Sequence, residues 1–146
     1  NNGYLDVPLE SEVFTKLGRF LEITQFVELP QIFQVIIGNM SFVGNRPLPK
    51  YNVEILKKHY PDSWYKRFES PAGLTGISQV VGKFQITPDQ RLELEGLYSE
   101  VYKKGDVQKA DAYIFFSTII LLLLRDASAY RSYKSAKYVL LMCLKK

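Results

Sequence analysis

The feature that most constrains this 146-residue chain is a run without any charged side chain, from Ala112 to Leu124. Apolar side chains leave water when a chain folds, so this run must pack against other elements or face a lipid surface. As a helix, its 13 residues span about 20 Å, which is less than the roughly 30 Å hydrocarbon core of a bilayer. The run therefore predicts a buried or membrane-interfacial helix and not a transmembrane span.

Length and composition indicate one folded domain that covers residues 1–146. Hydrophobic residues make up 47% and charged residues 23% of the chain, which is typical of a globular protein and not of a disordered one. The net charge of +4 is modest, and the basic residues near the C-terminus stand beside apolar runs. This pattern suits an anionic membrane surface better than nucleic acid, and a core helix with solvated lysines explains it equally well.

Most of the familiar catalytic patterns are absent from the sequence. The only histidine, His59, has no nucleophile motif around it, and a single cysteine, Cys143, excludes an internal disulfide and a thiolate metal cluster. No phosphate loop of the Gly-x-x-x-x-Gly-Lys type and no dinucleotide-binding glycine pattern occur. Nucleophilic chemistry through histidine is therefore not expected, and the lone thiol indicates a reducing compartment.

Periodicity, capping signals and glycine positions predict a mainly helical α+β domain. Helices are expected after Ser11, between Thr24 and Gly38, over Asn52–Phe68 with a break near Pro61, and from a capping box at Thr87 to Gly105. Glycines bracket a β-rich run, so short strands are expected around residues 40–46 and 76–82. The segment Tyr138–Leu144 predicts an amphipathic tail that lies on a membrane or packs on a partner segment.

Two stretches carry candidate site residues. Glu28 lies near the start of a predicted helix, where the positive helix end holds a carboxylate ionised. The loop Gly38–Pro49 follows, and its glycine and prolines present Arg46, whose guanidinium fork is suited to phosphate oxygens. An ordinary turn with a solvated arginine would give the same spacing. Further on, three polar residues are candidates to line a binding pocket, although the segment is equally consistent with a plain connector: Thr75, Gln79 and Lys83.

Five blocks of sequence occur in an order that resembles a known family. The blocks are Leu17–Leu21, Thr24–Gln31, Gly38–Leu48, Pro71–Gly76 and the pair Gln79 and Val80. From about Leu17 to Asp126, the chain resembles the catalytic domain of the bacterial sugar transferases, the monotopic polyprenyl-phosphate phosphoglycosyl transferases. The Asn-Arg-Pro loop and the Pro-Ala-Gly-Leu-Thr-Gly block look most like the version found among Bacteroidetes-type members.

The resemblance implies a specific reaction. Members of the family move a sugar phosphate from a nucleotide-activated sugar, typically a UDP-sugar, to polyprenyl phosphate at the cytoplasmic face of the bacterial inner membrane. This step starts a glycan chain, as in exopolysaccharide biosynthesis. An adjacent Asp-Glu pair carries the chemistry: the aspartate attacks phosphorus, and the glutamate helps to hold Mg²⁺, a hard cation that takes oxygen ligands. The implied partners are therefore a UDP-sugar, polyprenyl phosphate and the membrane surface.

Several residues of this chain match the family's site positions. Glu28 stands at the family glutamate, so it is also the implied magnesium ligand. Arg46, flanked by Asn45 and Pro47, stands at the arginine of the loop that contacts the phosphate region of the nucleotide sugar. These residues are the implied substrate-binding set, together with the three polar residues named above.

Val27 stands where the family has its aspartate nucleophile. A valine side chain has no lone pair to attack phosphorus and no charge for magnesium, so the usual two-step reaction cannot run through this position. Gln25, Asn39 and Glu95 also replace residues that are usual in the family. We therefore expect a domain that is inactive as it stands and that binds a partner protein, a membrane surface or a nucleotide sugar.

Alternatives to this expectation stay open. An active transferase would use another carboxylate, such as Glu28 or Asp6, and would need Mg²⁺; an inactive chain needs no cofactor. A non-catalytic chain would serve as a partner-binding or membrane-associated subunit. The re-entrant membrane helix that precedes the family's domain is not within these residues, so the chain is either a fragment of a longer protein or a domain that lacks that helix.

Overall fold

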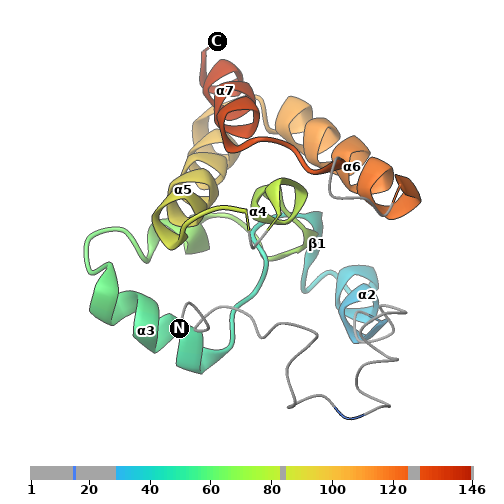
Figure 1. Ribbon diagram of the computed structural model, residues 1–146. Helices are drawn as coiled ribbons and strands as arrows, with labels where there is room; N and C mark the ends of the chain where they lie inside the picture. The colour runs from blue at the N-terminus through green and yellow to red at the C-terminus, as the bar shows by residue number, and fades with distance from the viewer. Residues whose placement is uncertain (1–14, 16–28, 83–84, 125–128, 146) are drawn as a thin grey trace.

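The computed structural model describes residue 15 and residues 29–82, 85–124 and 129–145. In chain order the elements are α2 (Leu29–Ile36), β1 (Ser41–Val43), α3 (Lys50–His59), the 3-10 helix η2 (Lys66–Glu69), β2 (Gly73–Thr75), α4 (Ile77–Val81), α5 (Pro88–Lys104), α6 (Val107–Leu124) and α7 (Tyr133–Leu144). Figure 1 shows α5, α6 and α7 on one side of the molecule, α2 and α3 on the other, and α4 and β1 between them. The predicted mainly helical α+β class is confirmed.

The two strands form a small parallel sheet. Ser41 lies opposite Gly73, and Val43 lies opposite Thr75. The backbones come so close that a Cβ atom on Gly73 would lie 2.1 Å from the backbone nitrogen of Gly44, so only glycine fits at this position. The sheet therefore fixes the loop that follows β1 against the start of β2.

One of the two predicted strands is wrong. The strand expected around residues 40–46 is present as β1, but most of residues 76–82 form helix α4, and β2 lies just before them. Ile77, Val80 and Val81 are spaced as one face of a helix and are all buried in the core. The side chains are β-branched, yet the packing that this face gains against α5 and α6 outweighs their intrinsic preference for a strand.

The helix boundaries follow the capping and proline signals. Thr87 and Gln90 form the predicted capping box at the start of α5, in which the backbone N–H of Gln90 donates to Thr87 Oγ1 at 3.3 Å. α5 ends before Gly105, as predicted. The helix predicted over residues 52–68 is broken near Pro61, as expected: α3 stops at His59, and turns lead to η2. His59 is exposed.

Helix α6 is longer than its uncharged run. It begins at Val107, five residues before Ala112, so its 18 residues span about 27 Å. The uncharged run alone therefore underestimates the length of this helix. Within the described residues, α6 is the one helix whose length and composition are sufficient to cross a membrane; its mean hydropathy is 1.6 and 17% of it is buried.

The hydrophobic core lies between α4, α5, α6 and α7. From α5 it contains Leu94, Tyr98 and Val101, and from α6 it contains Ala110 and Ile114. Helix α7 adds three buried side chains at helical spacing: Ala136, Leu140 and Cys143. One face of α7 thus packs into the core, as the core-helix alternative predicts. Its other face keeps Tyr138, Leu141 and Met142 exposed, and contact of that face with a membrane or a partner segment stays a prediction.

Candidate functional site

The loop that follows β1 lines a surface cavity of about 310 Å³. Three predicted substrate-binding residues, Asn45, Arg46 and Pro47, meet there. The other residues that line the cavity are Leu48, Arg67, Phe68, Ser70 and Ala72. The loop is tied to the sheet because the amide of Gly73 donates to the carbonyl oxygen of Asn45 at 3.0 Å. The sheet thus helps to place these three predicted residues at one cavity.

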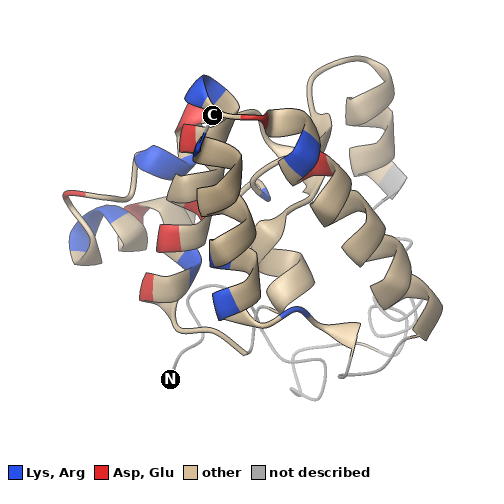
Figure 2. Cartoon of the chain, turned by 90° about the horizontal axis from the view of Figure 1, so that it is seen from above, with Lys and Arg blue, Asp and Glu red and all other residues tan. Residues whose placement is uncertain are grey.

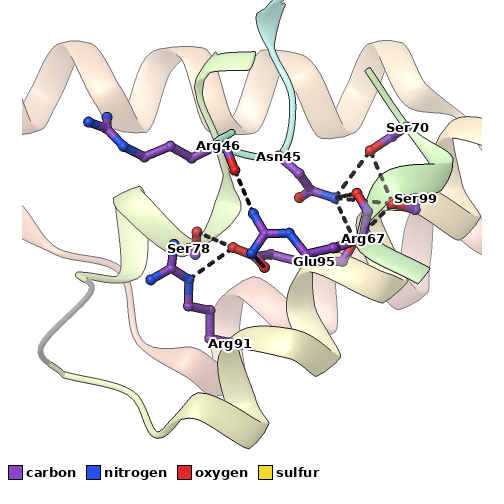
Figure 3. Close-up of polar contacts among 8 residues, drawn as sticks. All are labelled: Asn45, Arg46, Arg67, Ser70, Ser78, Arg91, Glu95 and Ser99. Carbon is purple, nitrogen blue, oxygen red and sulfur yellow. Dashed lines mark hydrogen bonds and ion pairs between the residues drawn. The ribbon is translucent and has the colours of Figure 1, made fainter. Parts of the chain in front are cut away.

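Asn45 is the anchor of this loop, and its side chain is only 4% exposed. Its Nδ2 atom lies within hydrogen-bond distance of four acceptors: the carbonyl oxygens of Arg67 and Glu95, both at 2.9 Å, and the hydroxyl oxygens of Ser70 and Ser99, both at 3.1 Å. An amide group has two N–H donors, so these acceptors share them. The nitrogen is therefore committed to the protein interior, and it fixes the loop to η2 and α5 (Figure 3).

Beneath the loop lies a group of four buried residues, the Glu95 cluster, which consists of Arg67, Ser78, Arg91 and Glu95. Arg67 Nη1 pairs with Glu95 Oε2 at 3.0 Å, and Arg91 Nε pairs with Oε1 at 3.0 Å. Ser78 Oγ donates to the same Oε1 at 2.9 Å. One carboxylate thus faces two guanidinium groups, and the cluster carries a formal charge of +1 when all three groups are ionised.

Burial shapes the electrostatics of the cluster. Desolvation lowers the pKa of Arg67, and the nearby Glu95 carboxylate opposes this effect. Arginine stays protonated in proteins because its unperturbed pKa is so high, so the guanidinium keeps its charge and needs the carboxylate. Loss of Glu95 would leave two buried cations without their partner.

Arg46 turns its backbone inward and its side chain outward. Arg67 Nη2 donates a hydrogen bond to the carbonyl oxygen of Arg46. In Figure 3 the Arg46 side chain extends away from the Glu95 cluster, while its carbonyl oxygen faces Arg67. The cluster therefore holds the backbone of the loop and leaves the Arg46 guanidinium outside the buried group.

The two other described candidates lie elsewhere. Thr75 is buried, and its hydroxyl lies 2.7 Å from that of Thr118 on α6. Gln79 is half-buried in α4, and its Nε2 atom donates to the carbonyl oxygen of Leu74 at 3.4 Å. Neither lines the cavity at Arg46. Val27, Glu28 and Lys83 lie outside the described residues.

The described residues contain no group of three or more His, Cys, Asp or Glu side chains that would suit a metal ion. The carboxylate of Glu95 lies beside the loop, and both of its oxygens already face groups of the protein: Arg67 at one oxygen, and Arg91 and Ser78 at the other. A magnesium ion prefers several oxygen ligands in octahedral geometry. The described residues therefore offer no ligand set for Mg²⁺, and Glu28, the implied magnesium ligand, lies outside them.

The sequence did not single out the Glu95 cluster as a unit. Arg91 and Glu95 are four residues apart in a helix that its capping box predicts, so this pair was open to prediction. Arg67 lies 28 residues before Glu95, in a segment predicted as a helix with a break near Pro61, and nothing local marks it as a partner. Only the packing of η2 on α5 brings these two residues together.

A large apolar surface lies on β1 and α6. Phe42 of β1 contacts Phe115 of α6 with ring centroids 5.5 Å apart, and Phe115 contacts Phe116 at 5.6 Å. Exposed aliphatic residues continue this surface along α6: Ile119, Leu122, Leu123 and Leu124. We call these seven residues the apolar face. Figure 2 shows the charged residues of α6 near its start and none along the rest of the helix.

This geometry defines a class of protein: a small, mainly helical domain in which two short parallel strands hold the loop that carries Arg46 and Pro47. Residues 8–125 match the family of bacterial sugar transferases, and the chain belongs to that family. No solved structure matches the chain.

Several similar proteins are named as transferases of a sugar or a sugar phosphate. The undecaprenyl-phosphate galactose phosphotransferase of Salmonella typhimurium is 33% identical over 114 residues, which are 78% of this chain and 22% of that protein. The galactosyl transferase CpsE of Streptococcus agalactiae is 34% identical over 110 residues, 75% of this chain and 21% of that protein. The UDP-glucose:undecaprenyl-phosphate glucose-1-phosphate transferase of Klebsiella pneumoniae is 32% identical, with 72% of this chain and 23% of that protein covered. The chain thus spans under a quarter of the length of these relatives.

Proposed function

We propose that this chain binds the UDP-sugar donor of a phosphoglycosyl transferase reaction and does not carry out the transfer itself. The observation that carries the proposal is Val27, which stands at the position of the family's nucleophile. In the two-step reaction, a carboxylate oxygen forms a bond to the phosphorus that bears the sugar, and the bond from this phosphorus to UMP breaks. Valine offers no atom that forms this bond.

Donor binding is supported by the loop at Arg46. Its guanidinium has the fork geometry that binds two phosphate oxygens at once, and the adjacent cavity offers room beside it. The excess positive charge of the Glu95 cluster beneath the loop favours an anion at this surface. A diphosphate bridging a nucleoside and a sugar matches both features.

A membrane position on the cytoplasmic face of the inner membrane is the second part of the proposal. The apolar face leaves large side chains in water, with Leu123 77% exposed and Phe116 61% exposed. Exposed apolar surfaces of this extent mark contact with a protein or a membrane. We infer that α6 rests on the bilayer surface and brings the donor loop near a lipid-linked acceptor such as undecaprenyl phosphate, which appears in the names of two relatives.

The experiment incubates the protein with radiolabelled UDP-galactose or UDP-glucose, undecaprenyl phosphate and Mg²⁺, and measures lipid-linked sugar phosphate. The protein as it stands is expected to form none, while calorimetric titration detects donor binding that Arg46→Ala weakens. Product formation by the unchanged protein would contradict the inactive assignment. The Val27→Asp variant restores the family nucleophile and is the matched comparison: a gain of product supports the view that Val27 is the gap in the site.

A further inference from the structure

Arg67 joins the helix α5 to the loop that carries Arg46. Its Nη1 atom pairs with Glu95 Oε2 at 3.0 Å, and its Nη2 atom donates to the carbonyl oxygen of Arg46. Arg67 is 3% exposed and Glu95 is fully buried, so bulk water screens this pair little. One planar guanidinium therefore connects a fixed carboxylate to the backbone of the loop.

The loop is held on both sides of Arg46. Before it, the side chain of Asn45 binds the carbonyl oxygens of Arg67 and Glu95. After it, the carbonyl group of Arg46 itself accepts from Arg67. Because the backbone sets the direction of the Cα–Cβ bond and the allowed rotamers, these contacts set where the Arg46 side chain begins and the directions it can take (Figure 3).

We propose that Arg67 and Glu95 are positioning residues for Arg46: their ion pair fixes the backbone from which the Arg46 guanidinium reaches the donor diphosphate. The inference rests on the proposed donor binding and assigns a role to two residues outside the loop. Lysine is a poor substitute for Arg67, because a single ammonium group on a flexible stem does not reproduce the two fixed donor directions of a guanidinium.

Arg91 provides a matched control within the same cluster. It is also buried and also pairs with Glu95 at 3.0 Å, but it approaches Oε1 together with Ser78, whereas Arg67 approaches Oε2. A substitution of either arginine by lysine keeps the charge and disturbs one contact to the same carboxylate. Only the Arg67 substitution removes the hydrogen bond to the loop carbonyl.

The test compares Arg67→Lys with Arg91→Lys by two measurements. Hydrogen–deuterium exchange of the segment 44–48 reports the order of the loop backbone, and calorimetric titration with UDP-galactose reports donor binding. Arg67→Lys is expected to speed exchange in this segment and to raise the Kd about tenfold, while Arg91→Lys changes neither at a similar loss of thermal stability. Glu95→Asp is a milder second variant, because the shorter side chain moves the carboxylate away from Arg67. It is expected to speed exchange and to raise the Kd, as Arg67→Lys does.

A double-substitution cycle separates positioning from general loss of structure. If Arg67 acts through Arg46, Arg67→Lys causes no further loss of donor affinity in an Arg46→Ala background, whereas a general structural effect adds in full. Unchanged exchange in Arg67→Lys, or equal effects of Arg67→Lys and Arg91→Lys, overturns the inference. Absence of any binding of UDP-galactose and UDP-glucose by the unchanged protein overturns the proposed function instead, and the exchange measurement then decides alone whether Arg67 orders the loop.

Discussion

The side chain of Asn45 donates to the backbone carbonyl of Glu95, 50 residues further along the chain, at 2.9 Å. The same nitrogen reaches the carbonyl oxygen of Arg67 at an equal distance. One amide group thus joins the loop after β1, the 3-10 helix η2 and helix α5. This junction explains how a loop without regular secondary structure is held in one conformation beside a cavity.

Asn45→Asp is expected to destabilise the protein by about 2–4 kcal/mol, although the two side chains have nearly the same shape. The substitution places a carboxylate oxygen against carbonyl oxygens and removes the donor that they share. Chemical denaturation measures the change in the free energy of unfolding. Asn39→Asp is the control, since Asn39 is exposed, and a change within about 0.5 kcal/mol is expected there. Equal effects of the two substitutions would contradict the anchoring role of Asn45.

Gly73→Ala is expected to cost about 2–4 kcal/mol, because the added Cβ atom would lie 2.1 Å from the backbone nitrogen of Gly44 and would push the two strands apart. Gly96→Ala serves as the comparison. Gly96 lies within helix α5, and its added Cβ atom would meet Lys66 Cβ at an ordinary 3.6 Å. Since alanine favours a helix over glycine, the stability is expected to rise by about 0.5–1 kcal/mol. Thermal denaturation of both variants distinguishes the two glycines, and a stable Gly73→Ala protein would argue against the close approach of β1 and β2.

The pair of Tyr98 and Asp111 gives a prediction for pH. Tyr98 donates to Asp111 Oδ1 at 2.7 Å, and desolvation raises the pKa of Asp111 above its ordinary value of 3.8 despite this hydrogen bond. The folded chain therefore binds this proton more tightly than the unfolded chain does, so the contribution of Asp111 to stability falls as pH rises from 3.8 through its folded pKa.

Asp111→Asn isolates this contribution, because the amide oxygen still accepts from Tyr98 and does not titrate. The stability of the unchanged protein minus that of the variant is expected to decrease with rising pH across this window and to level off above it. Urea denaturation at a series of pH values provides the difference. A difference that grows with pH would show that the carboxylate is stabilised, not penalised, by its surroundings.

Leu123→Asp tests the apolar face. This side chain is 77% exposed, so the substitution is expected to change the free energy of unfolding by less than about 0.5 kcal/mol. In a flotation assay with vesicles that contain anionic lipid, most of the variant is expected to stay unbound, because burying a charge in the acyl region is costly. Tyr51→Asp, at a side chain of α3 that is 73% exposed, is the matched control and is expected to float normally. Similar flotation of both variants would place the membrane contact elsewhere.

Local signals in the sequence predicted several elements correctly. The capping box at Thr87, the glycine stop at Gly105 and the break at Pro61 act within a few residues, so their outcome is readable from the chain alone. Residues 77–81 show the limit of such signals. Their β-branched side chains favour a strand, and burial of one helical face against α5 and α6 decides otherwise.

The candidate site divides in the same way. The motif at Asn45, Arg46 and Pro47 is a weak signal from spacing alone and a specific one from the family resemblance, and these residues do share a cavity. The support beneath them was not evident, because Arg67 and Glu95 meet only through the packing of η2 on α5. The uncharged run of α6 is identified from the sequence as a segment that needs cover, and the helix itself begins five residues earlier, at Val107, and continues across Lys109 and Asp111.

Intact-protein mass spectrometry after incubation with UDP-galactose or UDP-glucose and Mg²⁺ tests most directly whether the chain carries out the transfer. A transfer through a covalent intermediate adds the mass of a sugar phosphate to the protein and releases UMP. We expect an unchanged mass for the protein with Val27, together with measurable donor binding that depends on Arg46. A mass increase of one sugar phosphate on the unchanged protein would contradict this expectation, because another carboxylate would then act as the nucleophile.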